Sequence, residues 1–143
     1  MTPSVPELLM GNFLAMLDPT PAESAGDFMQ ARIGVTGMIS LLCAQEAERG
    51  IEARGWENTA IRALLAEAAG RYGDRFAQAA AGVDTDLSLA AMDRANAALR
   101  TALIDLHIAV ETARDAALDT QIRALYVKMA DARRLDLPPM PAS

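Results

Sequence analysis

The stretch IGVTGMISLLCAQ, residues 33–45, decides the fold because none of its 13 residues carries a charge. An amphipathic helix at a protein surface shows a charged face over this length, so the stretch predicts a helix that is buried on all sides. One stripe of this helix recurs at steps of three and four: Phe28, Ala31, Val35, Met38 and Leu42. A second face is mostly small, which allows another backbone to approach: Gly34, Gly37, Leu41 and Ala44. We expect residues 27–45 to form the central helix.

The composition of the 143-residue chain favours helices over sheets. Alanine, the strongest helix former, supplies 30 residues, whereas aromatic residues make up 4%. No segment alternates between apolar and polar residues as a strand does. The fold class predicted is therefore all-α, a bundle of four to five main helices with a buried central helix and one long helix. A single helical domain is expected over residues 1–137, followed by a Pro-rich tail at 138–143.

Capping and stop signals bound the individual helices. An apolar helix is expected over residues 7–17, and the Thr20-Pro21-Ala22-Glu23 pattern is typical of a helix start. That helix, which contains the central stretch, is expected to end at Gly55. Further helices are expected at residues 58–72, 74–81 and 119–134, the last either separate or continuous with the long helix.

The long helix is expected over residues 86–116, where N-cap oxygens at 84–86 precede an apolar seam. The seam follows steps of three and four: Leu89, Met92, Asn96, Leu99, Leu103, Leu106, Val110, Ala113 and Ala117. As candidate interface residues between chains we take Gly34, Gly37, Asn96, Leu99, Leu103 and Leu106. Asn96, the polar member, would fix the register or partner number of an assembly, lie at a wet edge of the seam, or satisfy a buried backbone group of its own chain.

The charge balance excludes some classes of partner. The net charge is −6 and the isoelectric point near 4.7, so the chain lacks the basic face on which nucleic-acid binding depends. No uncharged apolar run has the length of a membrane span, and no basic segment precedes an apolar run as in a signal peptide. We therefore expect no nucleic-acid partner, no membrane span and a cytoplasmic location. The excess of arginine over lysine is typical of a GC-rich bacterial coding sequence.

Few residues carry reactive chemistry. Cys43 lies in the uncharged stretch and is expected to be a buried hydrophobe. His107 and Glu111 lie four residues apart on one helix face and would either hydrogen-bond or hold a metal weakly, since a full site needs three or more ligands. No nucleotide-binding, hydrolase or metalloprotease motif occurs. We therefore expect no catalytic activity, no cofactor and no metal.

One pattern in the first half of the chain resembles a known family. It comprises residues 6–9 (PELL), residues 13–15 (FLA), Phe28 with residues 31–33 (ARI), and the apolar run into Glu46 and Glu48. It is similar to the N-terminal half of a family of small, all-helical, uncharacterised bacterial proteins encoded beside acyl-CoA dehydrogenases and kinase-like phosphotransferases. Where that family has Asn after the Arg-hydrophobic pair, this chain has Thr36 and Gly37. The resemblance implies an accessory or partner-binding role.

These observations lead to two functional hypotheses. The first is a non-catalytic interaction or accessory module that self-associates, most simply as a dimer, or binds a larger enzyme. The second is a helical bundle that binds an apolar or acyl small molecule in a methionine-rich pocket. The residues of that candidate pocket are Met10, Met16, Met29 and Met38. Methionine also fills irregular cores, so the four residues are compatible with either hypothesis.

Overall fold

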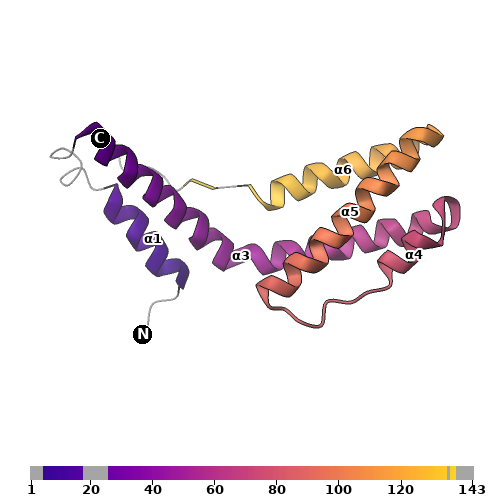
Figure 1. The fold of residues 1–143 in the computed structure, drawn as a ribbon, viewed down its shortest axis with the longest axis horizontal. Coiled ribbons are helices and arrows are strands. Elements are labelled where there is room, and N and C mark those ends of the chain that lie inside the picture. The colour runs from indigo at the N-terminus through magenta and orange to yellow at the C-terminus, as the bar shows by residue number, and fades with distance from the viewer. Residues whose placement is uncertain (1–4, 18–25, 135, 138–143) are drawn as a thin grey trace. The chain divides into compact units, whose positions relative to one another are not determined.

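The computed structural model describes residues 5–17, 26–134 and 136–137, which form helices and no strand (Figure 1). The helices are α1 (Val5–Met16), α3 (Asp27–Tyr72), α4 (Asp74–Ala80), α5 (Leu89–Ala113) and α6 (Ala116–Ala132). The all-α prediction is confirmed. None of these helices combines the length and apolar character that a membrane span requires. The expected helix start at Thr20 and the tail at 138–143 lie outside the described residues.

The chain divides into two compact units at residue 50. Unit 1 comprises the described residues up to 50 together with residues 136 and 137, and unit 2 comprises residues 51–134. Each unit is described separately below.

Unit 1 is built from α1 packed against the first half of α3, the two helices running in opposite directions (Figure 1). Phe13 of α1 is buried where Gly37 leaves room, and an ideal Cβ on Gly37 would lie 3.5 Å from the Phe13 ring. Asn12 donates a hydrogen bond of 2.7 Å to the Ser40 hydroxyl. Leu41 and Ala44 are buried beside this contact. Three of the four residues of the predicted small face, Gly37, Leu41 and Ala44, are thus buried on the α1 side, whereas Gly34 is exposed.

The expectation that the central helix is buried on all sides is wrong for the described chain. Phe28 is 76% exposed, Val35 60% and Ile39 54%. Cys43, expected in the core, is also exposed. A charge-free stretch indicates that a helix has no charged face. It does not indicate how many sides of that helix are covered by other segments of the same chain. In unit 1 that neighbour is α1, on one side of α3.

Unit 2 contains the principal core, formed by the second half of α3 with α4, α5 and α6 (Figure 1). The core includes four residues of the predicted seam on α5 and a matching stripe on α6. Its buried members are Ile61, Leu65, Ala68, Phe76, Leu99, Leu103, Leu106, Val110, Leu118, Ile122, Leu125 and Met129. The seam of α5 therefore packs inside its own chain.

Helix α3 is longer than predicted, and a tertiary contact accounts for the glycine within it. Helix α3 continues through Gly55 and Asn58, where an end and a new start were expected. Gly55 instead lies against α5, where its Cβ position would be 3.7 Å from the Met92 methyl group. Gly73 does end α3 as predicted, since its φ of 112° is one that glycine adopts freely.

The α5–α6 connection reverses the chain within two residues. Arg114 adopts the left-handed conformation with φ 56°, so α5 ends at Ala113 instead of Ala116. Asp115 then caps α6, its carboxylate accepting a hydrogen bond from the Leu118 backbone N–H. Arg71 and Tyr72 at the end of α3 donate to the other Asp115 oxygen at 2.7 and 2.9 Å. The turn is therefore held by α3 as well as by its own cap.

We expect Gly37→Leu to lower the free energy of unfolding by about 1–3 kcal/mol, because the added atoms would push Phe13 and Met16 away from α3. Gly37→Ala should be tolerated, since its Cβ meets these side chains at 3.5 and 3.6 Å, an ordinary contact distance. Gly34→Leu is the matched control, because nothing lies within 4 Å of its Cβ position. Thermal melts would measure these effects, and an increase in stability for Gly37→Leu would contradict the α1–α3 contact.

Candidate functional site

The most conspicuous surface feature of unit 1 is an apolar stripe on α3, which we call the α3 apolar face. It consists of Phe28, Val35, Met38, Ile39 and Leu42, which are 38–76% exposed. Val35, Met38, Ile39 and Leu42 are linked by steps of three and four residues, and Phe28 precedes Val35 by seven, or two helical turns, so the five positions share one side of the helix. Gly37, Leu41 and Ala44, which are buried, lie on the opposite side. The α3 apolar face thus points away from α1.

Charged residues of opposite sign lie on either side of residues 35–42 of this face. Arg32 follows Phe28 by one helical turn, and Glu46 follows Leu42 by one turn. A surface cavity of about 270 Å³ lies at the Arg32 end, and its described lining is Phe28, Ala31, Arg32, Val35 and Thr36. Clusters of exposed large apolar side chains of this kind mark interaction or ligand sites more often than scattered ones do.

Unit 2 contains a buried polar network centred on Glu57, which we call the Glu57 network. Glu57 and Asn58 of α3 are fully buried, and Asn96 of α5 is 4% exposed. Arg133, at the end of α6, donates to both Glu57 carboxylate oxygens, at 2.6 and 2.8 Å. The Asn96 amide donates to Glu57 at 2.9 Å and to Asn58 at 3.0 Å, and its oxygen accepts from Arg133 at 3.1 Å. One carboxylate therefore ties three helices together.

The Glu57 network continues into the α4–α5 loop. The Asn58 amide donates to Asp84 at 3.0 Å, and Arg62 donates to both oxygens of Asp84 at 2.8 and 2.7 Å. Burial by itself raises the pKa of Glu57, but the hydrogen bonds from Arg133 and Asn96 outweigh it and hold that pKa below its usual value. The hydrogen bonds from Arg62 likewise lower the pKa of Asp84. Both carboxylates are thus ionised and fully paired, an arrangement typical of structural ion pairs.

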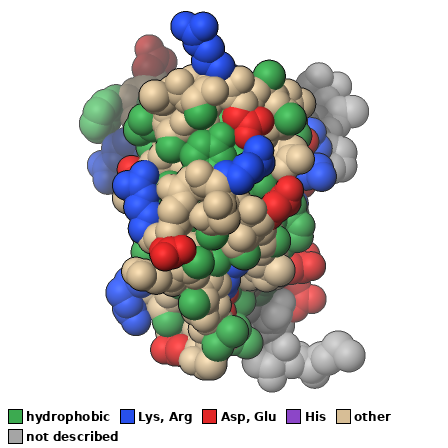
Figure 2. Space-filling model, turned by 90° about the vertical axis from the view of Figure 1, so that its right-hand side faces the viewer, with side chains coloured by type: hydrophobic (Ala, Val, Ile, Leu, Met, Phe, Trp, Pro, Cys, Tyr) green, Lys and Arg blue, Asp and Glu red, His purple; other side chains and the backbone are tan. Residues whose placement is uncertain are grey.

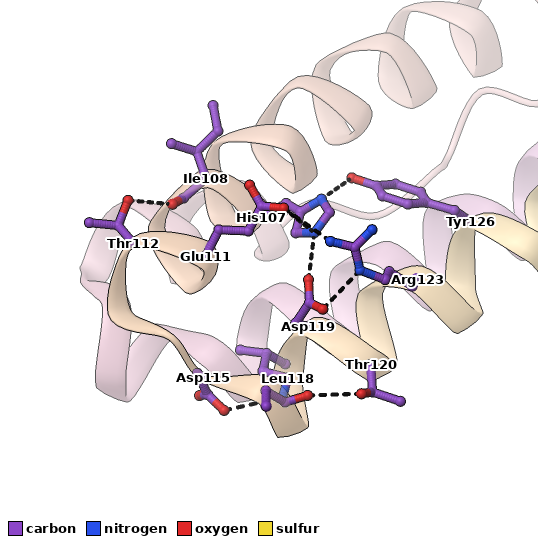
Figure 3. Close-up of polar contacts among 11 residues, drawn as sticks. His107, Ile108, Glu111, Thr112, Asp115, Leu118, Asp119, Thr120, Arg123 and Tyr126 are labelled. Carbon is purple, nitrogen blue, oxygen red and sulfur yellow. Dashed lines mark hydrogen bonds and ion pairs between the residues drawn. The ribbon is translucent and has the colours of Figure 1, made fainter.

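A second polar cluster lies beside the α5–α6 turn (Figure 3). His107 Nε2 lies 2.9 Å from Asp119 Oδ1 and 3.6 Å from Glu111 Oε1. Arg123 donates from Nε to Asp119 Oδ2 at 2.8 Å and from Nη2 to Glu111 Oε1 at 3.1 Å. The other imidazole nitrogen, Nδ1, lies 3.4 Å from the Tyr126 hydroxyl. The cluster brings one imidazole and two carboxylates together.

The surroundings of this His107 cluster are partly open to solvent. The side chain of His107 is 16% exposed, that of Asp119 27% and that of Glu111 54%. A cavity of about 340 Å³ adjoins the cluster, its described lining including Glu111, Asp119, Arg123, Arg114 and Asp115. Hydrogen bonds from Arg123, and then from His107, lower the pKa of Asp119. Among the described residues, His107, Glu111 and Asp119 are the group that could hold a metal, since their ligand atoms lie within 4.8 Å of one another.

The structure separates the candidate interface residues that the sequence grouped. Leu99, Leu103 and Leu106 belong to the core of unit 2, so the prediction that they contact another chain is corrected. They are covered by helices of their own chain because the α5–α6 reversal folds a second apolar stripe over them. Asn96 is buried in the Glu57 network, which rules out a wet edge. Gly37 packs against α1, whereas the Gly34 Cβ position has nothing within 4 Å.

The four methionines of the candidate pocket lie in unit 1 and differ in exposure. Met29 is 47% and Met38 38% exposed. Met16 packs against Gly37, and Met10 is half-buried. None of the four is among the described lining residues of the cavity beside Phe28.

Sequence reasoning missed Glu57, Arg133 and Asp119. Glu57 and Arg133 are 76 positions apart, so no local spacing connects them. Asp119 lies eight residues beyond Glu111, and it joins His107 because the chain reverses at Arg114. A turn predicted at residues 114–115 would have indicated this third carboxylate, and the N-capping Asp115 was the available signal.

On the surface drawn in Figure 2, the described basic and acidic side chains are interspersed with apolar ones and form no large patch of a single sign. Comparison of the chain with protein-family models, curated proteins and solved structures finds no match in any of the three. Inference about function therefore depends on the geometry of the described residues.

Proposed function

We propose that this protein is an interaction module that self-associates through the α3 apolar face, two copies of α3 packing in opposite directions. The observation that carries this proposal is the exposure of Phe28, Val35 and Ile39 on one side of a helix. Removing such side chains from water is favourable by about 1.5–3 kcal/mol each at full burial. A second copy of the same face offers a matching surface, since a two-fold interface uses one patch twice.

The charges on either side of residues 35–42 support an antiparallel pair. In that arrangement Arg32 of one copy approaches Glu46 of the other, and the two-fold axis repeats the contact at the far end. A parallel pair would instead place Arg32 beside the second Arg32 and Glu46 beside the second Glu46, so that like charges would repel. Opposite charges at the rim of an apolar interface favour the correct orientation more than they add affinity. A larger protein partner in a cytoplasmic complex is the alternative occupant.

The decisive variant is Ile39→Arg, which places a charge in the middle of the face. Because the residue is 54% exposed, the change should leave the fold intact. We expect the wild-type chain to be a dimer at micromolar concentration. In the variant the dissociation constant of the dimer should rise about 100-fold, because the two added charges would meet at the centre of the interface. Analytical ultracentrifugation measures both.

Ile104→Arg is the matched control, because Ile104 on α5 is 53% exposed and lies outside the face. It should leave the dimer unchanged. Arg32→Glu and Glu46→Arg should each weaken the dimer, and the double variant should recover it. A monomeric wild-type chain would contradict self-association through this face. So would an equal loss of dimer affinity in Ile39→Arg and Ile104→Arg.

A small-molecule site is the second candidate function, favoured by the cavity of about 270 Å³ beside Phe28 and Val35. Native mass spectrometry of protein purified from its own host separates the possibilities. A mass equal to two copies of the chain supports the proposal. A stoichiometric second protein would mean that the α3 apolar face binds a different protein and not a second copy of this chain. A retained apolar molecule, lost in Val35→Arg, would instead support ligand binding.

A further inference from the structure

We propose that His107, Glu111 and Asp119 form a binding site for Zn²⁺ at the α5–α6 turn. The site lies in unit 2 and stands independently of the α3 apolar face. Zinc in proteins is held by imidazole nitrogen and carboxylate oxygen at about 2.0–2.2 Å, commonly by three protein ligands and a water. Here one imidazole and two carboxylates present their ligand atoms within 4.8 Å of one another.

Two of the ligand–ligand distances within the cluster are close to those of tetrahedral coordination. Two ligands of a tetrahedral zinc are separated by about 3.4 Å, given the bond lengths above. His107 Nε2 lies 2.9 Å from Asp119 Oδ1 and 3.6 Å from Glu111 Oε1, so the two separations bracket that value. His107 and Glu111 are fixed one turn apart on α5, and Asp119 is set by the turn that Asp115 caps. Metal entry therefore needs small side-chain movements and no change of backbone.

The groups around the ligands are those that support a metal site. A metal-bound imidazole commonly uses its other nitrogen to hydrogen-bond a neighbour, which orients the ring. Tyr126 occupies that position, with its hydroxyl 3.4 Å from His107 Nδ1 (Figure 3). Arg123 holds Asp119 by Oδ2, leaving Oδ1 directed toward His107. The adjoining cavity of about 340 Å³ gives water access to a fourth coordination position.

Arg123 is both a support and a competitor in this arrangement. Its Nη2 hydrogen bond to Glu111 Oε1 would be exchanged for the metal, whereas its Nε hydrogen bond to Asp119 Oδ2 would stay. The Arg123 side chain is 59% exposed and can swing into solvent. Removing this guanidinium takes away a positive charge next to the metal as well as the hydrogen bond that orients Asp119. We expect the loss of charge repulsion to be the larger effect, so removal should strengthen metal binding, whereas in a purely structural ion-pair cluster it would only weaken the fold.

The chain's composition makes the test unusually clean, because it has one histidine and one cysteine. Untagged Cys43→Ser protein would be titrated with Co²⁺, whose visible absorption reports tetrahedral coordination, and then with Zn²⁺ in competition and by calorimetry. We expect one site per chain, a metal-dependent rise in melting temperature, and loss of both signals in His107→Ala. Glu111→Gln, at a 54% exposed side chain, should weaken binding without unfolding the protein.

Three further variants distinguish the zinc site from other outcomes. Arg123→Met should tighten metal binding, Tyr126→Phe should weaken it about tenfold, and Asp105→Asn, an exposed carboxylate on α5, should leave it unchanged. Binding that survives in His107→Ala would show an adventitious ion only and would overturn the proposal. So would an Arg123→Met variant that loses stability and shows no gain in metal affinity.

Discussion

Arg133→Met is expected to lower the free energy of unfolding by about 3 kcal/mol, among the largest single-residue effects in this protein. Arg133 supplies both charged hydrogen bonds to Glu57, which is fully buried. Removing the cation leaves a carboxylate in the core with Asn96 as its remaining described donor. We place the loss at the lower end of the range for buried ion pairs because the Arg133 side chain is 34% exposed. Urea unfolding would measure it.

Lys128→Met, also on α6, is the matched control, since it removes one exposed cation and should change stability by less than about 0.5 kcal/mol. Glu57→Met combined with Arg133→Met should recover part of the loss, because apolar residues can replace a buried ion pair at little cost. A loss in Arg133→Met no larger than in the lysine control would mean that Glu57 is not held by this pair.

The pH dependence of stability gives a second measurement of the same interaction. Because the pKa of Glu57 is lowered in the folded protein, its contribution is fully present above its usual value of 4.5 and is lost as pH falls through the folded pKa. Arg133→Met removes a hydrogen bond that lowers this pKa. The variant should therefore lose less stability than the wild type on acidification from about pH 6 to about pH 3.

Asn96→Leu is expected to destabilise the protein by about 2–3 kcal/mol. The substitution removes the amide that donates to Glu57 and Asn58 and the oxygen that accepts from Arg133. Buried polar groups left without partners cost about 1–3 kcal/mol, and more when charged. Thermal and chemical denaturation would measure the loss.

This expectation corrects the idea that Asn96 sets the register of an assembly, for which Asn96→Leu would give a more stable but less uniform oligomer. Ala97→Leu, at the next and exposed position of α5, controls for added bulk and should be nearly neutral. A rise in stability of Asn96→Leu, with mixed oligomers in the ultracentrifuge, would restore the assembly interpretation.

Local signals in the sequence determined much of the helical framework. The glycine at 73 ended a helix where predicted, since glycine adopts φ 112° without strain, and the short helix that begins at Asp74 followed. The apolar recurrence from Met92 to Val110 identified the buried side of α5. Caps and periodicity act over a few residues, so they can be read without knowledge of the fold.

Tertiary structure alone decided what each apolar or polar side faces. Leu103 and Val35 follow the same apolar periodicity, yet Leu103 lies in the core with residues of α3 and α6 and Val35 is 60% exposed. The periodicity identifies the apolar side of a helix but not what packs against it. The contact between Glu57 and Arg133 joins helices that are far apart in the sequence, and the contact between His107 and Asp119 arises from the chain reversal between α5 and α6. Such contacts depend on where helices end and how they pack. Their residues therefore become a network or a candidate metal site only in the folded chain.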